Sequence, residues 1–120
     1  MTQTYGPDRI REMNSLAVLA YLRAIEDTTS SQIAAATGLS RTSVNATITD
    51  LERLGWVQSL PPTSPPTGRP AKRYRFRSES GFVLGVDIGA NRIATSLTDL
   101  CGEEKRAEET ELAPSSAAPR

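Results

Sequence analysis

The sequence predicts a mainly α fold with a small β-hairpin, followed by an incomplete two-strand α/β segment. Apolar residues recur at helical spacing in three segments that end near residue 54. Residues 56–60 and 71–77 then alternate between apolar and polar side chains, as the two strands of a hairpin do. An apolar run over residues 82–88 begins a separate segment.

The first predicted helix runs from Pro7 to about Ile25. Pro7 suits the first helical position, where its missing N–H costs nothing. Two neighbouring apolar stripes follow at three-to-four spacing, one of them Ile10, Met13, Ala17 and Tyr21, and the other Val18, Leu22 and Ile25.

A second, shorter helix is predicted from Ser30 or Ser31 to about Thr37. Thr29-Ser30-Ser31-Gln32 fits a capping box, in which Thr29 closes the helix start and Gln32 reaches back. Ile33 and Ala34 are its inward residues, and Gly38 can take the left-handed conformation that ends it.

The third predicted helix begins after Ser40, a plausible N-cap, and runs to about Leu54. Its apolar stripe is formed by Val44, Ile48 and Leu51. Gly55 is expected to stop it.

The hairpin consists of Trp56–Leu60 and residues 71–77, joined by a loop over residues 61–70 that is rich in proline, threonine and glycine. Tyr74 and Phe76 share one face of the returning strand and are expected in the core, and Trp56 is expected to fill the core under the hairpin. Three helices followed by a two-stranded hairpin form the winged helix-turn-helix layout, here predicted over residues 7–78.

Residues 81–102 are predicted to start a second domain, with a strand at 82–88 and a partner strand over residues 93–100. Residues 103–120 are acidic and then rich in alanine, proline and serine, so we expect a disordered tail.

The helix-turn-helix reading depends on three positions. A small residue lets the two helices approach, a glycine permits the turn, and an apolar residue fixes the crossing; Ala34, Gly38 and Val44 occur in that order. The opposite face of the third helix can then enter a major groove. Arg41, Thr42, Asn45, Ala46 and Thr49 are the predicted base-facing residues, and Ser40 and Ser43 the predicted phosphate contacts. The alternative is a solvated helix face capped by Ser40.

The loop of the hairpin contains Gly68-Arg69-Pro70, which places an arginine on an extended backbone. Such a side chain can enter the minor groove, where the negative potential is strong. Arg69, Lys72 and Arg73 are therefore further predicted DNA contacts, and a solvent-exposed basic turn is the alternative.

Composition agrees with a nucleic-acid partner for the first part of the chain. The 120 residues have a formal net charge of zero. Residues 1–78, however, hold ten Lys/Arg and six Asp/Glu, whereas residues 79–120 hold four and eight. The chain has no histidine and one cysteine, Cys101, so we expect no metal, no cofactor and no enzymatic activity. With no apolar run long enough to cross a membrane, a cytoplasmic protein without membrane partners is expected.

The sequence resembles the N-terminal part of the ROK family of transcriptional regulators, a family that also contains sugar kinases. The resemblance is carried by residues 33–44, by Leu51-Glu52-Arg53-Leu54-Gly55-Trp56-Val57, by Gly68-Arg69-Pro70-Ala71 and by residues 81–89. It implies a domain that binds double-stranded DNA as a homodimer and represses genes of carbohydrate use. It also implies that residues 81–102 begin an actin-like domain, truncated here, which in the family senses a sugar effector.

Two alternatives stay open: a truncated sugar kinase of the same family, and a winged helix that contacts protein rather than DNA. In the kinases, the turn after the first strand is glycine-rich with a Thr-Lys pair. Here that turn reads Ala90-Asn91-Arg92, so Asp87 is expected to be a remnant of the fold rather than part of a nucleotide site.

Overall fold

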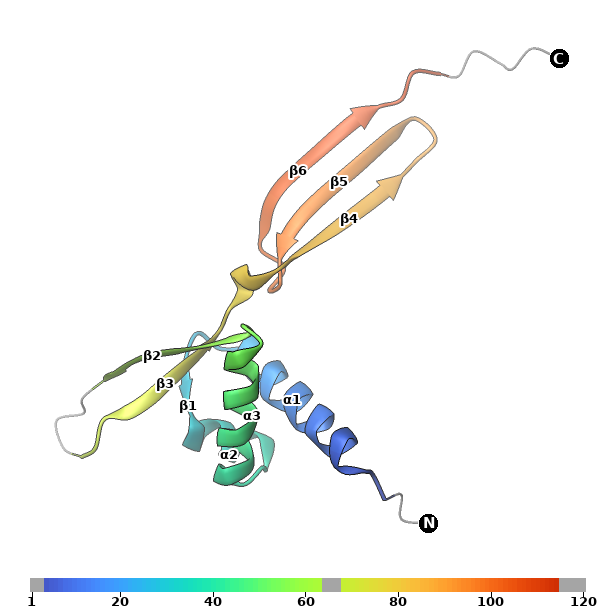
Figure 1. Cartoon of the computed structure of the whole chain (residues 1–120). Coiled ribbons are helices and arrows are strands. Elements are labelled where there is room, and N and C mark those ends of the chain that lie inside the picture. Colours follow the sequence, from blue (N-terminus) through green and yellow to red (C-terminus); the bar gives the residue numbers. More distant parts are fainter. Residues whose placement is uncertain (1–3, 64–67, 115–120) are drawn as a thin grey trace. The chain divides into compact units, whose positions relative to one another are not determined.

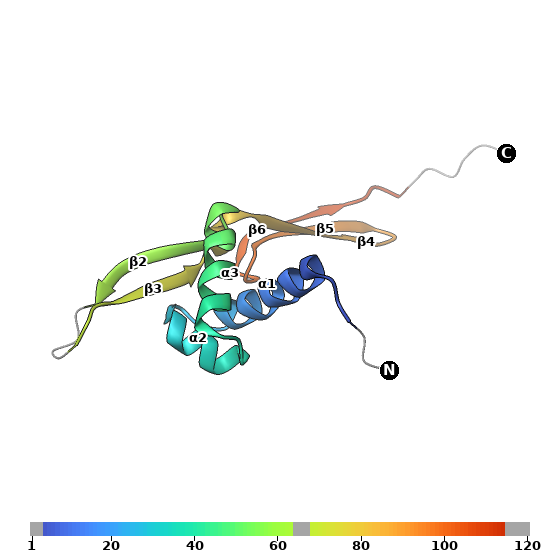
Figure 2. The same ribbon diagram turned by 60° about the horizontal axis from the view of Figure 1, so that its bottom comes forward.

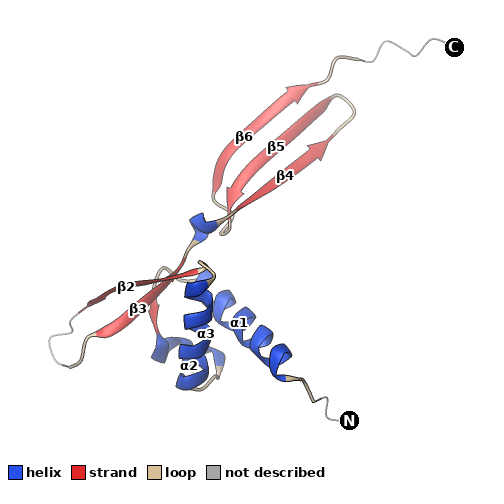
Figure 3. Ribbon diagram, in the orientation of Figure 1, coloured by secondary structure: helices blue, strands red, loops and turns tan. Residues whose placement is uncertain are grey.

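The chain divides into two units, residues 1–77 and residues 78–120. The computed structural model describes residues 4–63 and 68–114. The first unit contains three α-helices and a small sheet, and the second contains the strands β4 to β6 (Figure 1). Figure 3 shows helices beside strands in the first unit and strands after a short helical turn in the second.

The helices of the first unit are α1 (Pro7–Arg23), α2 (Ser30–Thr37) and α3 (Arg41–Arg53). All three were predicted, and α1 ends two residues earlier than expected. Its C-cap is Ala24, whose N–H donates to the carbonyl of Tyr21 over 3.1 Å. Gly6 precedes the helix without a side-chain cap, and Pro7 occupies the first helical position as predicted.

The capping interactions predicted around α2 and α3 are present. The Gln32 N–H donates to Thr29 Oγ1 over 3.3 Å, and the Thr29 N–H donates to Gln32 Oε1 over 3.1 Å. Gly38 follows α2 with φ of 74°, and its N–H donates to the carbonyl of Ala34. Ser40 caps α3 by accepting the N–H of Ser43 over 3.1 Å.

The sheet of the first unit has the order β1-β3-β2 and is antiparallel. Strand β1 (Thr28–Thr29) was not predicted, and β3 (Ala71–Phe76) was. Strand β2 (Val57–Thr63) extends into the segment that we expected to be loop, which is a correction. The pairing is irregular between Leu60 and Thr63, because the two prolines between them have no N–H to donate to the ladder. Residues 64–67 of the predicted loop lie outside the described residues.

The core of the first unit is formed by apolar residues of all three helices and by one face of the hairpin. The described apolar residues less than 9% exposed are Val18, Leu22, Ile33, Val44, Ile48, Leu51, Val57, Tyr74 and Phe76. Tyr74 and Phe76 are therefore core residues, as predicted. Four residues of α3 are buried in or beside this core, and the residues on its other side are exposed. Figure 2 shows α3 together with α1, α2 and the hairpin.

Two apolar expectations for this unit are corrected. Ile10 and Met13 are 49% and 47% exposed, and Ala17 is exposed, because α1 packs on α2, α3 and β3 through its other stripe. Trp56 is 38% exposed rather than in the core. It precedes β2, and the buried position at the start of that strand is occupied by Val57.

The second unit begins with a 3-10 turn (Ser78–Ser80) and continues as a three-stranded antiparallel sheet in the order β4-β5-β6. Strands β4 (Phe82–Ile88) and β5 (Arg92–Asp99) correspond to the two predicted strands. Residues 103–120 were expected to be disordered, but Glu104–Glu111 form β6 and pair with β5, which corrects both the tail and the number of strands.

Side chains of this sheet are largely exposed. Every residue of β4 and β6 is exposed, including Phe82, Leu84 and Ile88 at 59%, 62% and 74%. Residues 93–98 of β5 are half-buried. Asp99, at the β5–β6 turn, is 3% exposed and accepts the N–H groups of Cys101 and Glu103, each over 2.9 Å. The hydrogen bond from Glu103 is the main reason that the pKa of Asp99 lies below its usual value.

Candidate nucleic-acid interface

Helix α3 has one buried and one exposed face. Val44, Thr47, Ile48 and Leu51 are buried against the rest of the first unit. The predicted base-facing residues all lie on the exposed side of the helix; they are Arg41, Thr42, Asn45, Ala46 and Thr49. The apolar stripe of the sequence thus determines which side chains of α3 are available to a partner.

Three of the polar side chains on α3 are engaged by the helix itself. Ser40 Oγ accepts the N–H of Ser43 and donates to Ser43 Oγ over 3.0 Å. Thr49 Oγ1 donates to the carbonyl of Asn45 over 2.9 Å. Ser40 therefore has a clear structural role as N-cap, in addition to the phosphate contact predicted for it.

Arg41 connects α3 with α2. Its Nη1 donates to Ser31 Oγ over 2.7 Å, across ten residues of sequence. Both side chains are exposed, and both belong to the first turn of their helices. The guanidinium of Arg41 is thus directed to the N-terminal end of α2.

The three basic residues predicted for the wing differ in their surroundings. Arg73 is held by Asp27: its Nε donates to Oδ1 over 3.0 Å, and its Nη2 contacts Oδ2. The two side chains are only 28% and 33% exposed. By contrast, Arg69 and Lys72 are exposed, and neither forms an ion pair with a described residue. Arg73 therefore has a structural partner, while Arg69 and Lys72 are available.

A cleft of about 410 Å³ lies where the first turns of α2 and α3 meet the start of β3. It is lined by Thr29, Ser30, Ser31, Arg41, Asn45, Arg69, Pro70, Ala71, Lys72 and Tyr74. Four of the predicted DNA contacts thus come together there, namely Arg41 and Asn45 from α3 and Arg69 and Lys72 from the wing. The other six, Ser40, Thr42, Ser43, Ala46, Thr49 and Arg73, do not line it.

The lining of this cleft favours an anion. It includes three cationic side chains and no carboxylate among the described residues. The first N–H groups of a helix have no intrahelical acceptor and attract negative charge, and the start of α2 contributes to the wall. Asn45 adds a side-chain amide, which can both donate and accept.

Ser31 is the site residue that sequence reasoning missed. The capping box located the start of α2, so the position of Ser31 in its first turn could be predicted. Its proximity to Arg41 could not, because it depends on the angle between the two helices. The sequence of neither helix alone determines that angle.

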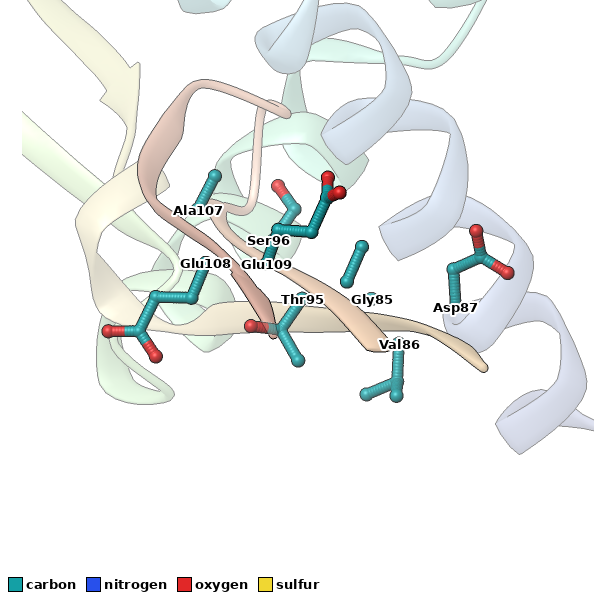
Figure 4. Close-up of a pocket in the computed structure, with 9 residues that line it drawn as sticks. Gly85, Val86, Asp87, Thr95, Ser96, Ala107, Glu108 and Glu109 are labelled. Atoms are coloured by element: carbon teal, nitrogen blue, oxygen red, sulfur yellow. The ribbon is translucent and has the colours of Figure 1, made fainter. Parts of the chain in front are cut away.

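The second unit has a shallow cavity of about 580 Å³ over its sheet, with Gly85, Val86 and Asp87 from β4, Thr95 and Ser96 from β5, and Ala107, Glu108 and Glu109 from β6 (Figure 4). The charged side chains in its described lining are all acidic. Arg92 lies 3.8 Å from the Asp87 carboxylate and 3.1 Å from that of Glu109. This lining does not suit a phosphate group.

Two further properties concern only the described part of the chain. Within residues 4–63 and 68–114, His, Cys, Asp and Glu do not gather in threes as a metal site requires. None of the helices in these ranges has the length and apolarity needed to cross a membrane.

Comparison with known proteins agrees with this architecture. Residues 12–69 match the MarR family. Among curated proteins there is no match. A solved structure described as a ROK family transcriptional regulator, homolog of the E. coli MLC protein, superposes with a TM-score of 0.66 at 16% identity. The superposition covers 86% of this chain and 26% of that one, so this chain spans about a quarter of the regulator and shares its fold over that part.

Proposed function

We propose, because residues 12–69 match the MarR family and fold as a winged helix, that this chain is a sequence-specific DNA-binding transcriptional regulator. Helix α3 enters the major groove, and Arg69 of the wing enters the adjacent minor groove. The observation that carries the proposal is the cleft in which Arg41 and Asn45 of α3 meet Arg69 and Lys72 of the wing, which form no ion pair with a described residue.

The exposed face of α3 provides the chemistry for reading bases. Asn45 can form a bidentate pair with adenine, and the methyl groups of Thr42 and Ala46 can contact the methyl group of thymine. These three side chains are exposed on one side of a helix whose other side is fixed in the core. A helix fixed in this way can present its side chains to base edges in one register.

The biological role follows from the resemblance to ROK regulators and not from the interface. We infer a repressor of carbohydrate-utilisation genes that acts as a homodimer, and for which a sugar effector requires a complete C-terminal domain. No described residue is assigned a catalytic role. A two-fold symmetric dimer recognises inverted repeats, so the arrangement of the bound site reports on this part of the proposal.

The test is selection of binding sites from a random duplex library with the full chain, followed by titration of the selected duplex at several salt concentrations. We expect one enriched sequence, arranged as an inverted repeat. The affinity should fall steeply as salt rises, because each neutralised phosphate releases counterions. A chain that binds no duplex even at low salt would contradict the proposal. Recovery of single half-sites would contradict the homodimer alone.

A further inference from the structure

We infer that one DNA backbone phosphate binds in the cleft lined by the first turns of α2 and α3 and by the start of β3. Arg41 and Ser31 hold this phosphate. Arg41 then fixes the position of α3 on the duplex and does not read a base. This assignment rests on the proposed DNA binding and changes the role that the sequence predicted for Arg41.

The geometry of Arg41 is the first reason. Its Nη1 donates to Ser31 Oγ over 2.7 Å, which directs the guanidinium to the end of α2. A guanidinium carries five N–H donors, so the others stay available for phosphate oxygens. Ser31 accepts this bond through its oxygen, and its own O–H is left to donate to the same phosphate.

The concentration of charge is the second reason. Arg69 and Lys72 line the same cleft as Arg41, and none of the three forms an ion pair with a described residue. Asp27, which pairs with Arg73, is not among the residues that line the cleft. Three cationic side chains around one cleft create a positive potential that favours binding of an anion beside Arg41.

The start of α2 is the third reason. The N–H of Gln32 donates to Thr29 Oγ1. The N–H groups of Ser30 and Ser31, in the first turn of α2, have no acceptor within the helix. Ser30 and Ser31 both line the cleft. Helix starts of this kind bind phosphate groups through N–H donors and the helix dipole.

Base reading by Arg41 would require another geometry. A bidentate pair with guanine uses the guanidinium fork on one base edge in the major groove. The hydrogen bond to Ser31 instead directs the Arg41 guanidinium to the start of α2, where the free N–H groups of the helix favour a phosphate. Asn45, one turn further along α3, has no such tie to α2 and keeps the reading role.

Variants of the full chain can separate the two roles on the selected duplex and on a scrambled one. We expect Arg41→Ala to weaken binding to both by the same factor, on the order of tenfold, and to reduce the salt slope by about one. Arg41→Lys keeps the charge without the fork and should retain part of the affinity. Asn45→Ala should weaken the selected duplex and spare the scrambled one.

Arg53→Ala is the matched control, because Arg53 is an exposed arginine of α3 outside the cleft. It should change binding to either duplex by less than about twofold. Loss of affinity for the selected duplex alone in Arg41→Ala would make Arg41 a base reader and overturn the inference. Circular dichroism verifies that each variant is folded.

A titration of the full chain with inorganic sulfate, followed by NMR, tests anion binding in the cleft without DNA. Saturable shifts at Ser31 and at the Arg41 side chain, with those at Ser31 lost in Arg41→Ala, support it. The absence of such shifts in the unmodified chain overturns it. If these shifts occur and no duplex binds, the anion-binding site is supported and the proposed regulatory function is contradicted.

Discussion

Neighbouring basic residues on β3 have different roles because strand residues alternate in direction. Lys72 lines the cationic cleft, whereas Arg73 faces the connection between α1 and α2 and pairs with Asp27. This ion pair lies beside the short pairing of β1 with β3, in which Thr29 is opposite Arg73. Arg73 therefore anchors the wing to the helical part of the unit.

We predict that the Arg73–Asp27 pair contributes to stability and not to DNA affinity. Arg73→Ala and Asp27→Ala should each lower the midpoint of thermal unfolding, and the double variant should reveal a coupling of about 1 kcal/mol, because the pair is partly shielded and bidentate. Melting curves of the four proteins measure this coupling. Lys72→Ala is the matched control, which should reduce DNA affinity and leave the midpoint unchanged. An equal loss of affinity in Arg73→Ala would restore Arg73 to the interface.

Periodicity predicts the buried residues of α3 because a helix places every third or fourth residue on one side. Val44, Ile48 and Leu51 were identified in this way, and the exposed face followed from them. Partners distant in sequence were not predictable. Asp27 lies 46 residues before Arg73, and only the fold brings the two together. The same holds for Trp56, whose burial depends on where β2 begins.

The turn between α2 and α3 depends on a left-handed residue. Gly38 has φ of 74°, and a Cβ placed there would meet no atom within 4 Å. The cost of a side chain at this position is thus a cost of backbone conformation and not of crowding.

We predict that Gly38→Ala lowers the free energy of unfolding by roughly 1–2 kcal/mol, because an L-residue resists the left-handed region. Gly38→Asn is the matched variant and should cost less, since asparagine tolerates this conformation at the end of a helix. Urea unfolding of both proteins provides the comparison. Equal losses in the two variants would show that the turn is sensitive to the side chain rather than to φ.

The β5–β6 turn is organised by a buried carboxylate. Asp99 accepts two backbone N–H groups, and Gly102 has the positive φ of 85° that closes the turn. Because the folded state lowers the pKa of Asp99, the ionised form favours folding. Its contribution is present above the pKa of the unfolded chain, about 3.9, and is lost as the pH falls through the folded value.

We therefore predict that the NMR signals of β5 and β6 lose their folded dispersion in acid, below about pH 4. Asp99→Asn should weaken this sheet already at neutral pH and should reduce its response to acid. Asp87→Asn is the control, because Asp87 is 73% exposed. An unchanged acid response in Asp99→Asn would assign it to another group.

The amino-acid composition of residues 104–111 did not predict that they form strand β6. Its eight residues contain four glutamates, and all of its side chains are exposed, so nothing in the segment indicates a core. The strand is nevertheless paired with β5 through its backbone from Arg92↔Glu111 to Thr98↔Glu104, with one register shift between Leu97 and Thr98. Backbone pairing depends on the neighbouring strand and is independent of side-chain apolarity.

At the scale of the whole chain, charge and burial are distributed differently between the two units. The described part of the first unit has an apolar core of nine residues and a cleft lined by three cationic side chains. In the described part of the second unit, Asp99 is the buried residue, and the apolar side chains of β4 are exposed. Apolar burial is the main source of stability, so the two units should differ in stability.

We predict that native-state hydrogen exchange separates the two units. Amides of α3 and of the β2–β3 pairing should be the slowest to exchange, and those of β4 to β6 should exchange faster, because few buried apolar contacts oppose local opening of that sheet. Ile48→Ala should remove about 2–4 kcal/mol of protection from the slowest amides of the first unit, since the side chain is 2% exposed. Leu84→Ala, at a residue 62% exposed, should change protection little. Protection of β4 to β6 equal to that of α3 would mean that the sheet is stabilised by contacts other than its own buried side chains.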